Sequence, residues 1–192
     1  MNEIVEAIKA RRTIRKYKPE QIEEEKLDAI LAAGLHAPSI GGRQASIIVV
    51  CQNSKLNEEL GRMNRLSFEF PPNIGRITRN TNQPGINDDA TIQSAFYNAP
   101  TVLTIFAQKT YNLTGESFAV AENILVAAHS LGIGGCIVAR AIETFATKRG
   151  RQIQINWGLG FEYEAKLHIT LGYLQGEPPK DKIIREGRII RV

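Results

Sequence analysis

The chain alternates stretches whose apolar residues recur at helical spacing with short runs rich in β-branched residues. Apolar residues three and four positions apart predict an amphipathic helix over residues 3–12. A second helix is expected to begin at Pro19, because proline suits a first helical turn, and to stop between Gly34 and Pro38. The other predicted helices are one capped by Ser54, a strongly periodic and buried one from Phe118 to Leu131, and a brief one with Ile142 and Phe145.

Four short apolar runs predict strands, at residues 47–51, 101–107, 136–138 and 167–173. The first is dense in isoleucine and valine and is expected to be a buried strand. The last alternates apolar and polar residues, which is typical of a half-buried strand. Strands separated by helices favour a mixed fold of α and β layers, and the pattern alone leaves the order of the strands open.

Two regions lack sustained periodicity. Residues 67–98 are rich in proline, glycine and asparagine, and so long an irregular stretch in a compact domain is usually functional, so we expect a lid-like insertion. Residues 177–192 follow a Gly-Glu-Pro-Pro turn and are expected to form an extended C-terminal arm or an edge strand. With no internal repeat, residues 1–192 are interpreted as a single domain.

Composition excludes several classes of protein. The 192 residues are 43% hydrophobic and 23% charged, which rules out a disordered chain, a collagen-like repeat and a disulfide scaffold. The net charge of +4 is a mild excess of base, compatible either with solvated surface cations or with an anionic small molecule such as a phosphate. It is not the dense cationic stripe of a nucleic-acid binder, and aromatic residues make up only 7%. We therefore expect no nucleic-acid partner.

The sequence contains no motif for a metal site or a redox-active thiol pair, and no segment typical of a membrane protein. The two cysteines are not in a CxxC pair, and the three histidines lack the spacing of zinc ligands, so no metal site is expected. The first residues, MNEIVEAIKARR, lack the apolar core of a signal peptide. No run approaches the roughly 18 apolar residues of a membrane span. We expect a cytoplasmic protein without membrane contact.

The first candidate site is residues 11–16, RRTIRK, in which four cations and one hydroxyl follow the first predicted helix. Composition alone favours a solvated helix end, where cations complement the helix dipole. The alternative is an anion site. In an extended stretch Arg11, Thr13 and Arg15 point the same way, and their guanidinium and hydroxyl groups suit a phosphate and a polar ring.

Two glycine-containing segments are further candidates. In residues 37–44, APSIGGRQ, adjacent glycines permit close approach of a ligand to the backbone, and Gln44 offers an amide to a heterocycle; the alternative is a plain connecting loop. In residues 131–136, LGIGGC, glycines between helix and strand predict a tight turn or clustered N–H groups. Their spacing is not the GxGxxG of a dinucleotide-binding fold.

Five segments taken in order, RRTIRKY, APSIGGRQ, FYNAPTVLTIF, AAHSLGIGGCIV and LGYLQGEPP, give the chain a resemblance to the FMN-dependent nitroreductase family that runs nearly end to end. The resemblance implies an α+β fold with a central mixed sheet flanked by helices. It also implies an intertwined homodimer with FMN at the interface. The implied activity is that of an FMN-dependent oxidoreductase. It would take hydride from NADH or NADPH and pass it to a small planar acceptor such as a nitroaromatic or a quinone.

The resemblance also implies the residues that contact FMN. Arg11 and Thr13 would hold the phosphate and ribityl chain, and Arg15 would lie near the pyrimidine end of the ring. From its charge we expect Arg15 to stabilise the reduced flavin there. Residues of the second segment would reach the flavin bound to the partner subunit. The full implied set is Arg11, Arg12, Thr13, Arg15, Pro38, Ser39, Gln44, Asn64, Gly134, Gly135, Lys182 and Arg185, with Arg188 as a further basic residue of the tail.

The chain departs from the family pattern at several places. Gly42 stands where the family prefers asparagine, Ala45-Ser46 where it prefers Pro-Trp, and Ile183-Ile184 where short members often have Pro-Arg. These changes remove polar or aromatic groups near the implied ring site and leave flavin affinity and acceptor preference open. A non-enzymatic flavin-binding dimer, a sensor or a store, is therefore the alternative function.

Overall fold

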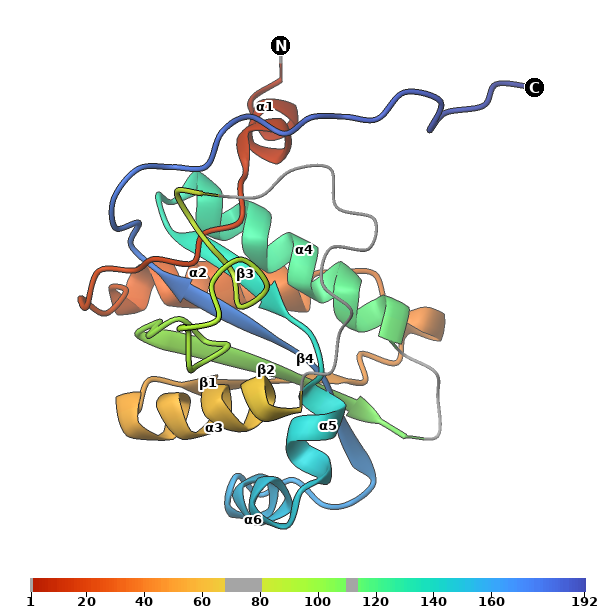
Figure 1. Cartoon of the computed structure of the whole chain (residues 1–192). Coiled ribbons are helices and arrows are strands. Elements are labelled where there is room, and N and C mark those ends of the chain that lie inside the picture. Colours follow the sequence, from red (N-terminus) through yellow and green to blue (C-terminus); the bar gives the residue numbers. More distant parts are fainter. Residues whose placement is uncertain (1, 68–80, 110–113) are drawn as a thin grey trace.

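The computed structural model describes residues 2–67, 81–109 and 114–192, which form a central sheet with helices on both faces (Figure 1). This confirms the predicted α+β architecture. The elements in chain order are α1 (Glu3–Ala10), α2 (Glu24–Leu35), a short 3-10 turn (Ile40–Gly42), β1 (Ser46–Cys51), α3 (Ser54–Leu66), β2 (Thr101–Gln108), α4 (Thr114–Ser130), β3 (Gly134–Val138), α5 (Ala141–Ala146), α6 (Lys148–Asn156) and β4 (Tyr163–Gly172).

The four strands lie in the order β1-β2-β4-β3, and each neighbouring pair is antiparallel. Among the described residues, the one parallel pairing is a bridge between Thr13 and Gly135, on the outer side of β3. The order places β1 at one edge of the sheet. The prediction of a buried strand was wrong there, since Cys51 is the one fully buried residue of β1.

Strand β4 is more buried than the half-buried strand that the sequence predicts. Every residue from Leu167 to Gly172 is buried, because β4 lies between two strands and under helices on both faces. Its polar residues remain inside because they have partners. The side chains of Thr104 and His168, which face each other across β2 and β4, are joined by a 2.9 Å hydrogen bond.

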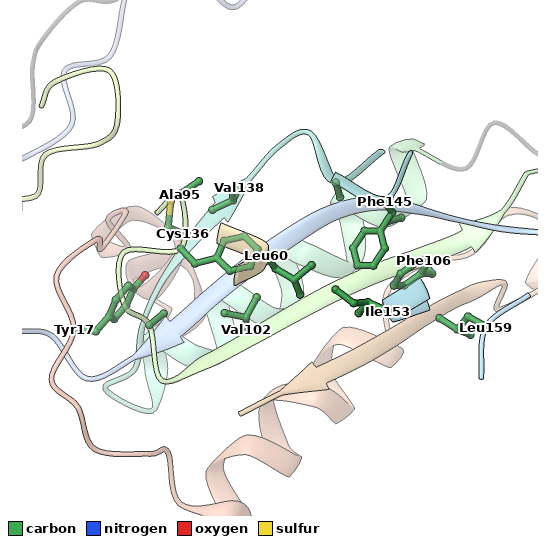
Figure 2. Close-up of a cluster of buried hydrophobic side chains, with 14 of the residues drawn as sticks. Tyr17, Leu60, Ala95, Val102, Phe106, Cys136, Val138, Phe145, Ile153 and Leu159 are labelled. Atoms are coloured by element: carbon green, nitrogen blue, oxygen red, sulfur yellow. The ribbon is translucent and has the colours of Figure 1, made fainter. Parts of the chain in front are cut away.

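The sheet separates two apolar cores. One holds residues of α2 and α4, including Ile30 and Ile124, against one face of β2 and β4. The other packs α3, α5 and α6 on the opposite face, through Leu60, Phe145 and Ile153 (Figure 2). Successive residues of β2 enter opposite cores, which is why its sequence is a continuous apolar run.

Several local predictions needed correction. Helix α2 begins at Glu24, so Pro19 lies before the helix and not in its first turn. The cap of α3 is Asn53, whose side chain accepts a hydrogen bond from the N–H of Leu56, one residue before the predicted Ser54. Helix α4 buries one side, and Phe118 on its predicted apolar stripe is 45% exposed.

The irregular regions contain few regular elements. Of residues 67–98, positions 68–80 lie outside the described residues, and 81–98 form turns without a helix or strand. Residues 177–192 form an extended arm that runs past α1 and carries no strand (Figure 1). Within the described part of the chain, no helix is both long and apolar enough to cross a membrane.

Candidate functional site

The arginine-rich segment and the third glycine segment lie side by side. Helix α1 ends where the N–H of Arg11 bonds the carbonyl of Ala7, and the chain then continues in extended form. Ile14 donates its N–H to the carbonyl of Gly135 at 3.1 Å, next to the bridge between Thr13 and Gly135. Two candidate sites more than one hundred residues apart in the sequence are thus brought together at the edge strand β3.

Packing explains the two glycines of β3. A Cβ on Gly134 would lie 2.7 to 2.9 Å from side-chain atoms of Ile14, and one on Gly135 would lie 2.5 Å from Leu125 of α4. Both positions need a residue without a side chain so that the arginine-rich segment and α4 can approach β3. The tight turn predicted for residues 131–136 is made at Gly132, with φ +76°. Gly134 and Gly135 belong to strand β3 and not to the turn.

Arg15 is half-buried and closely surrounded. Its Nη1 donates to the carbonyl of Gln83 at 3.1 Å, and its guanidinium lies 5.9 Å from the centre of the Tyr97 ring. The thiol of Cys136, buried in β3, contacts it from the sheet. Burial opposes the charge, but coulombic attraction to Cys136, Tyr97 and Tyr17 outweighs burial and raises the pKa of Arg15. Arg15 is therefore a fixed cation.

The other two arginines of the segment point to different elements. Arg11 forms a 3.8 Å ion pair with Glu122 of α4, which is too long for a hydrogen bond. Arg12 donates to the carbonyl of Lys9 at 2.6 Å and to the carboxylate of Asp181 in the C-terminal arm at 2.9 Å. The segment thereby ties α1, α4 and the arm together.

The arginines retain unused hydrogen-bond donors. The Nε of Arg12 and of Arg15 is buried without a hydrogen-bond partner among the described residues, and the Nε of Arg11 has only its 3.8 Å ion pair with Glu122. A buried donor without a hydrogen bond is costly, so this segment favours an additional acceptor such as an anion. The surroundings are electropositive: burial lowers the pKa of His129, and the charges of Arg11 and Arg12 lower it further.

The second candidate segment lies at the end of α2. Pro38 and Gln44 are exposed, and the hydroxyl of Ser39 accepts from the backbone N–H of Gln44 at 3.2 Å. The segment is held by Glu116 of α4, whose carboxylate accepts from the N–H of Ile40 at 3.0 Å and from the hydroxyl of Ser46 at 3.4 Å. Among the described residues, no hydrogen bond joins it to Arg11–Arg15.

The remaining predicted residues have separate places. Asn64 of α3 is fully buried; its amide donates to the carbonyl of Ala139 at 2.8 Å and accepts from Arg140 at 3.0 Å. Lys182 and Arg185 are exposed in the arm, just after the Asp181 that pairs with Arg12. A cavity of about 290 Å³ between α5, α6 and β4 is lined by none of the residues that the resemblance implies for FMN binding.

Sequence reasoning missed Gln83 and Glu116, both of them buried polar residues that organise the candidate segments. Gln83 lies in a stretch without periodicity, and no local signal could have identified it. Glu116 offered a weak signal, because it is an acidic residue at the start of a long apolar helix.

Comparison with known proteins identifies the relatives of this arrangement. The model of a family described as the nitroreductase family matches residues 8–173. A nitroreductase with bound FMN from Bacteroides fragilis NCTC 9343 has a TM-score of 0.83 and 27% identity, with 100% of both chains covered. A nitroreductase with bound FMN from Desulfitobacterium hafniense DCB-2 has a TM-score of 0.82 and 25% identity, covering 100% of this chain and 99% of that one. No curated protein matches the chain.

Proposed function

The chain belongs to the nitroreductase family, and on that premise we propose that it is an FMN-dependent NAD(P)H oxidoreductase. It would take hydride from NADH or NADPH and pass it to a small planar acceptor such as a nitroaromatic or a quinone. The FMN-bound relatives support the cofactor. The observation that carries the proposal is the group of three buried guanidinium Nε donors in the segment packed along β3.

The donor set fits a phosphorylated cofactor. A phosphate offers several oxygen acceptors and about two negative charges, which match the guanidinium groups of Arg11 and Arg12 and the hydroxyl of Thr13. Lys182 and Arg185 follow Asp181, whose exposed carboxylate pairs with Arg12, and they would add charge at the same end. FMN would supply the hydride chemistry that no amino-acid side chain provides.

In this proposal Arg15 acts at the flavin ring and not at the phosphate. Its guanidinium is a cation fixed by protein contacts, and such a charge beside the flavin ring favours the more negative, reduced form. Gly134 and Gly135 would contribute through the backbone of β3, since the space beside each is filled by Ile14 and by Leu125. The amide of Asn64 is engaged by protein groups, so a contact with the ring would require it to rearrange.

We further propose that a second copy of the chain completes the site. Pro38, Ser39 and Gln44 lie apart from Arg11–Arg15 in one subunit, as expected if they serve the flavin of the partner. Two apolar surfaces suit an interface between copies. One is the apolar face of α1, with no buried residue, and the other is the arm; the apolar residues concerned are Ile4, Val5, Ile8, Ile183, Ile184, Ile189 and Ile190.

The test is to mix the purified protein with NADH or NADPH without oxygen and to follow the visible flavin band. Bleaching, and recovery on adding a quinone or nitroaromatic, supports the reductase; a flavin spectrum that persists with both nucleotides supports the non-enzymatic binder. The variant Arg15→Ala is expected to slow bleaching far more than it lowers thermal stability. Normal bleaching in that variant would contradict the role of Arg15. Sedimentation as a single chain would contradict the dimer.

A further inference from the structure

The side chain of Gln83 joins two segments that are distant in the sequence. It is fully buried, and its Oε1 accepts hydrogen bonds from the backbone N–H groups of Arg15 and Lys16, both at 2.7 Å. Its Nε2 donates to the carbonyls of Gln175 and Glu177, at 3.3 and 3.2 Å. One amide therefore satisfies four backbone groups, two in the arginine-rich segment and two where the C-terminal arm begins.

The residues around Gln83 also hold the guanidinium of Arg15. The main-chain carbonyl of Gln83 accepts from its Nη1, and the ring of Tyr97 lies on another side. Gly85 is packed so closely that a Cβ there would lie 3.2 Å from the Nε of Arg15. Gln83 thus fixes the backbone of Arg15 through its side chain and the charge of Arg15 through its carbonyl.

We propose that Gln83 is a positioning residue for the flavin reaction, which holds the Arg15 charge at the flavin and couples it to the C-terminal arm. The inference rests on the proposed function, since it concerns the same site. The electrostatic effect of a cation depends on its distance from the developing charge, so a shift of Arg15 changes the preference for reduced flavin. Glutamine suits this position because it carries an acceptor and a donor on one uncharged group.

The decisive variant is Gln83→Met, which keeps the length of the side chain and removes the four hydrogen bonds to the backbone described above. We expect reduced FMN to lose about tenfold more affinity than oxidised FMN, which lowers the two-electron midpoint potential by about 30 mV. Binding of oxidised FMN to the apoprotein is measured in parallel by flavin fluorescence. An unchanged or raised potential overturns the inference.

Gln154→Met is the matched control. Gln154 of α6 is also a buried glutamine, and its amide donates to the carbonyls of Gly160 and Tyr163 at 2.8 and 3.1 Å. A purely structural role for Gln83 predicts that both variants lose stability and that neither changes the potential. The inference predicts a changed potential in Gln83→Met alone.

If Gln83→Met does not fold, Gly85→Ala tests whether the position of Arg15 sets the flavin potential. Its new Cβ crowds the guanidinium of Arg15, which must give by a few tenths of an ångström, while the side chain of Gln83 is unchanged. We expect a potential shift in the same direction, corresponding to about a threefold change in relative affinity. No shift overturns the inference. A wild-type protein that neither contains nor binds FMN overturns the proposed function instead, so the two failures are distinguishable.

Discussion

Replacement of Gly134 by alanine tests the contact between β3 and the arginine-rich segment at a single atom. The new Cβ would lie 2.7, 2.8 and 2.9 Å from Cγ1, Cβ and Cγ2 of Ile14, where carbon atoms pack favourably at about 3.5–4.0 Å. A rotamer change cannot relieve the conflict, because one of the three atoms is the Cβ of Ile14 itself. The two backbones must therefore move apart, which strains the 3.1 Å bond from Ile14 to Gly135.

Overpacking of this kind costs about 1–3 kcal/mol, and the weakened hydrogen bond adds about 1 kcal/mol. We expect urea denaturation of Gly134→Ala to show a loss of about 2–4 kcal/mol of unfolding free energy. Because the displaced segment carries the proposed phosphate ligands, we also expect FMN affinity to fall at least tenfold.

Gly115→Ala in α4 is the matched control for this prediction. Apart from its chain neighbours and its own helix backbone, no atom of the described residues lies within 4 Å of a Cβ at Gly115, and its backbone is not left-handed, so stability should stay unchanged or rise by up to about 1 kcal/mol. If Gly134→Ala is as stable as Gly115→Ala and binds FMN equally well, the proposed packing at β3 is wrong.

Three further predictions concern buried groups outside that contact. Burial lowers the pKa of His168 to about 3, so between pH 6.5 and 3 the unfolded chain binds a proton on this side chain and the folded chain does not. Urea denaturation should therefore show the free energy of unfolding falling by up to about 1.4 kcal/mol for each pH unit of acidification in that range. The fall should be less steep in His168→Gln. Glu116→Ala removes the acceptor that holds residues 39–46, and should cost about 1–3 kcal/mol and speed proteolysis within that segment. Burial raises the pKa of Cys51 and of Cys136, so a thiol reagent should modify both at once in denaturant and neither quickly in the native protein.

The elements that sequence reasoning predicted well are those defined by local periodicity. The apolar spacing in α3 and the continuous apolar run of β2 depend on neighbouring residues alone, so they are visible in the sequence. The burial of β1 and β4 was misjudged because it depends on the strand order, which local patterns do not contain. Likewise, Pro19 is compatible with a first helical turn, yet nothing local shows that the helix begins five residues later.

The candidate site divides in the same way. The arginines and the β3 glycines were identifiable because they form short segments that match a family pattern in order. Gln83 was not identifiable, because its role arises from four backbone groups contributed by two distant segments. The necessity of Gly134 was likewise invisible, since it depends on the side chain of Ile14 packed against it.

The central claim is that the arginine-rich segment beside β3 binds FMN. Its most direct test is the absorbance spectrum of the purified protein, followed by release and identification of any bound cofactor and by titration of the stripped protein with FMN. We expect a yellow protein that releases FMN, about one per chain, and takes it up again. A colourless protein that does not bind added FMN would contradict it.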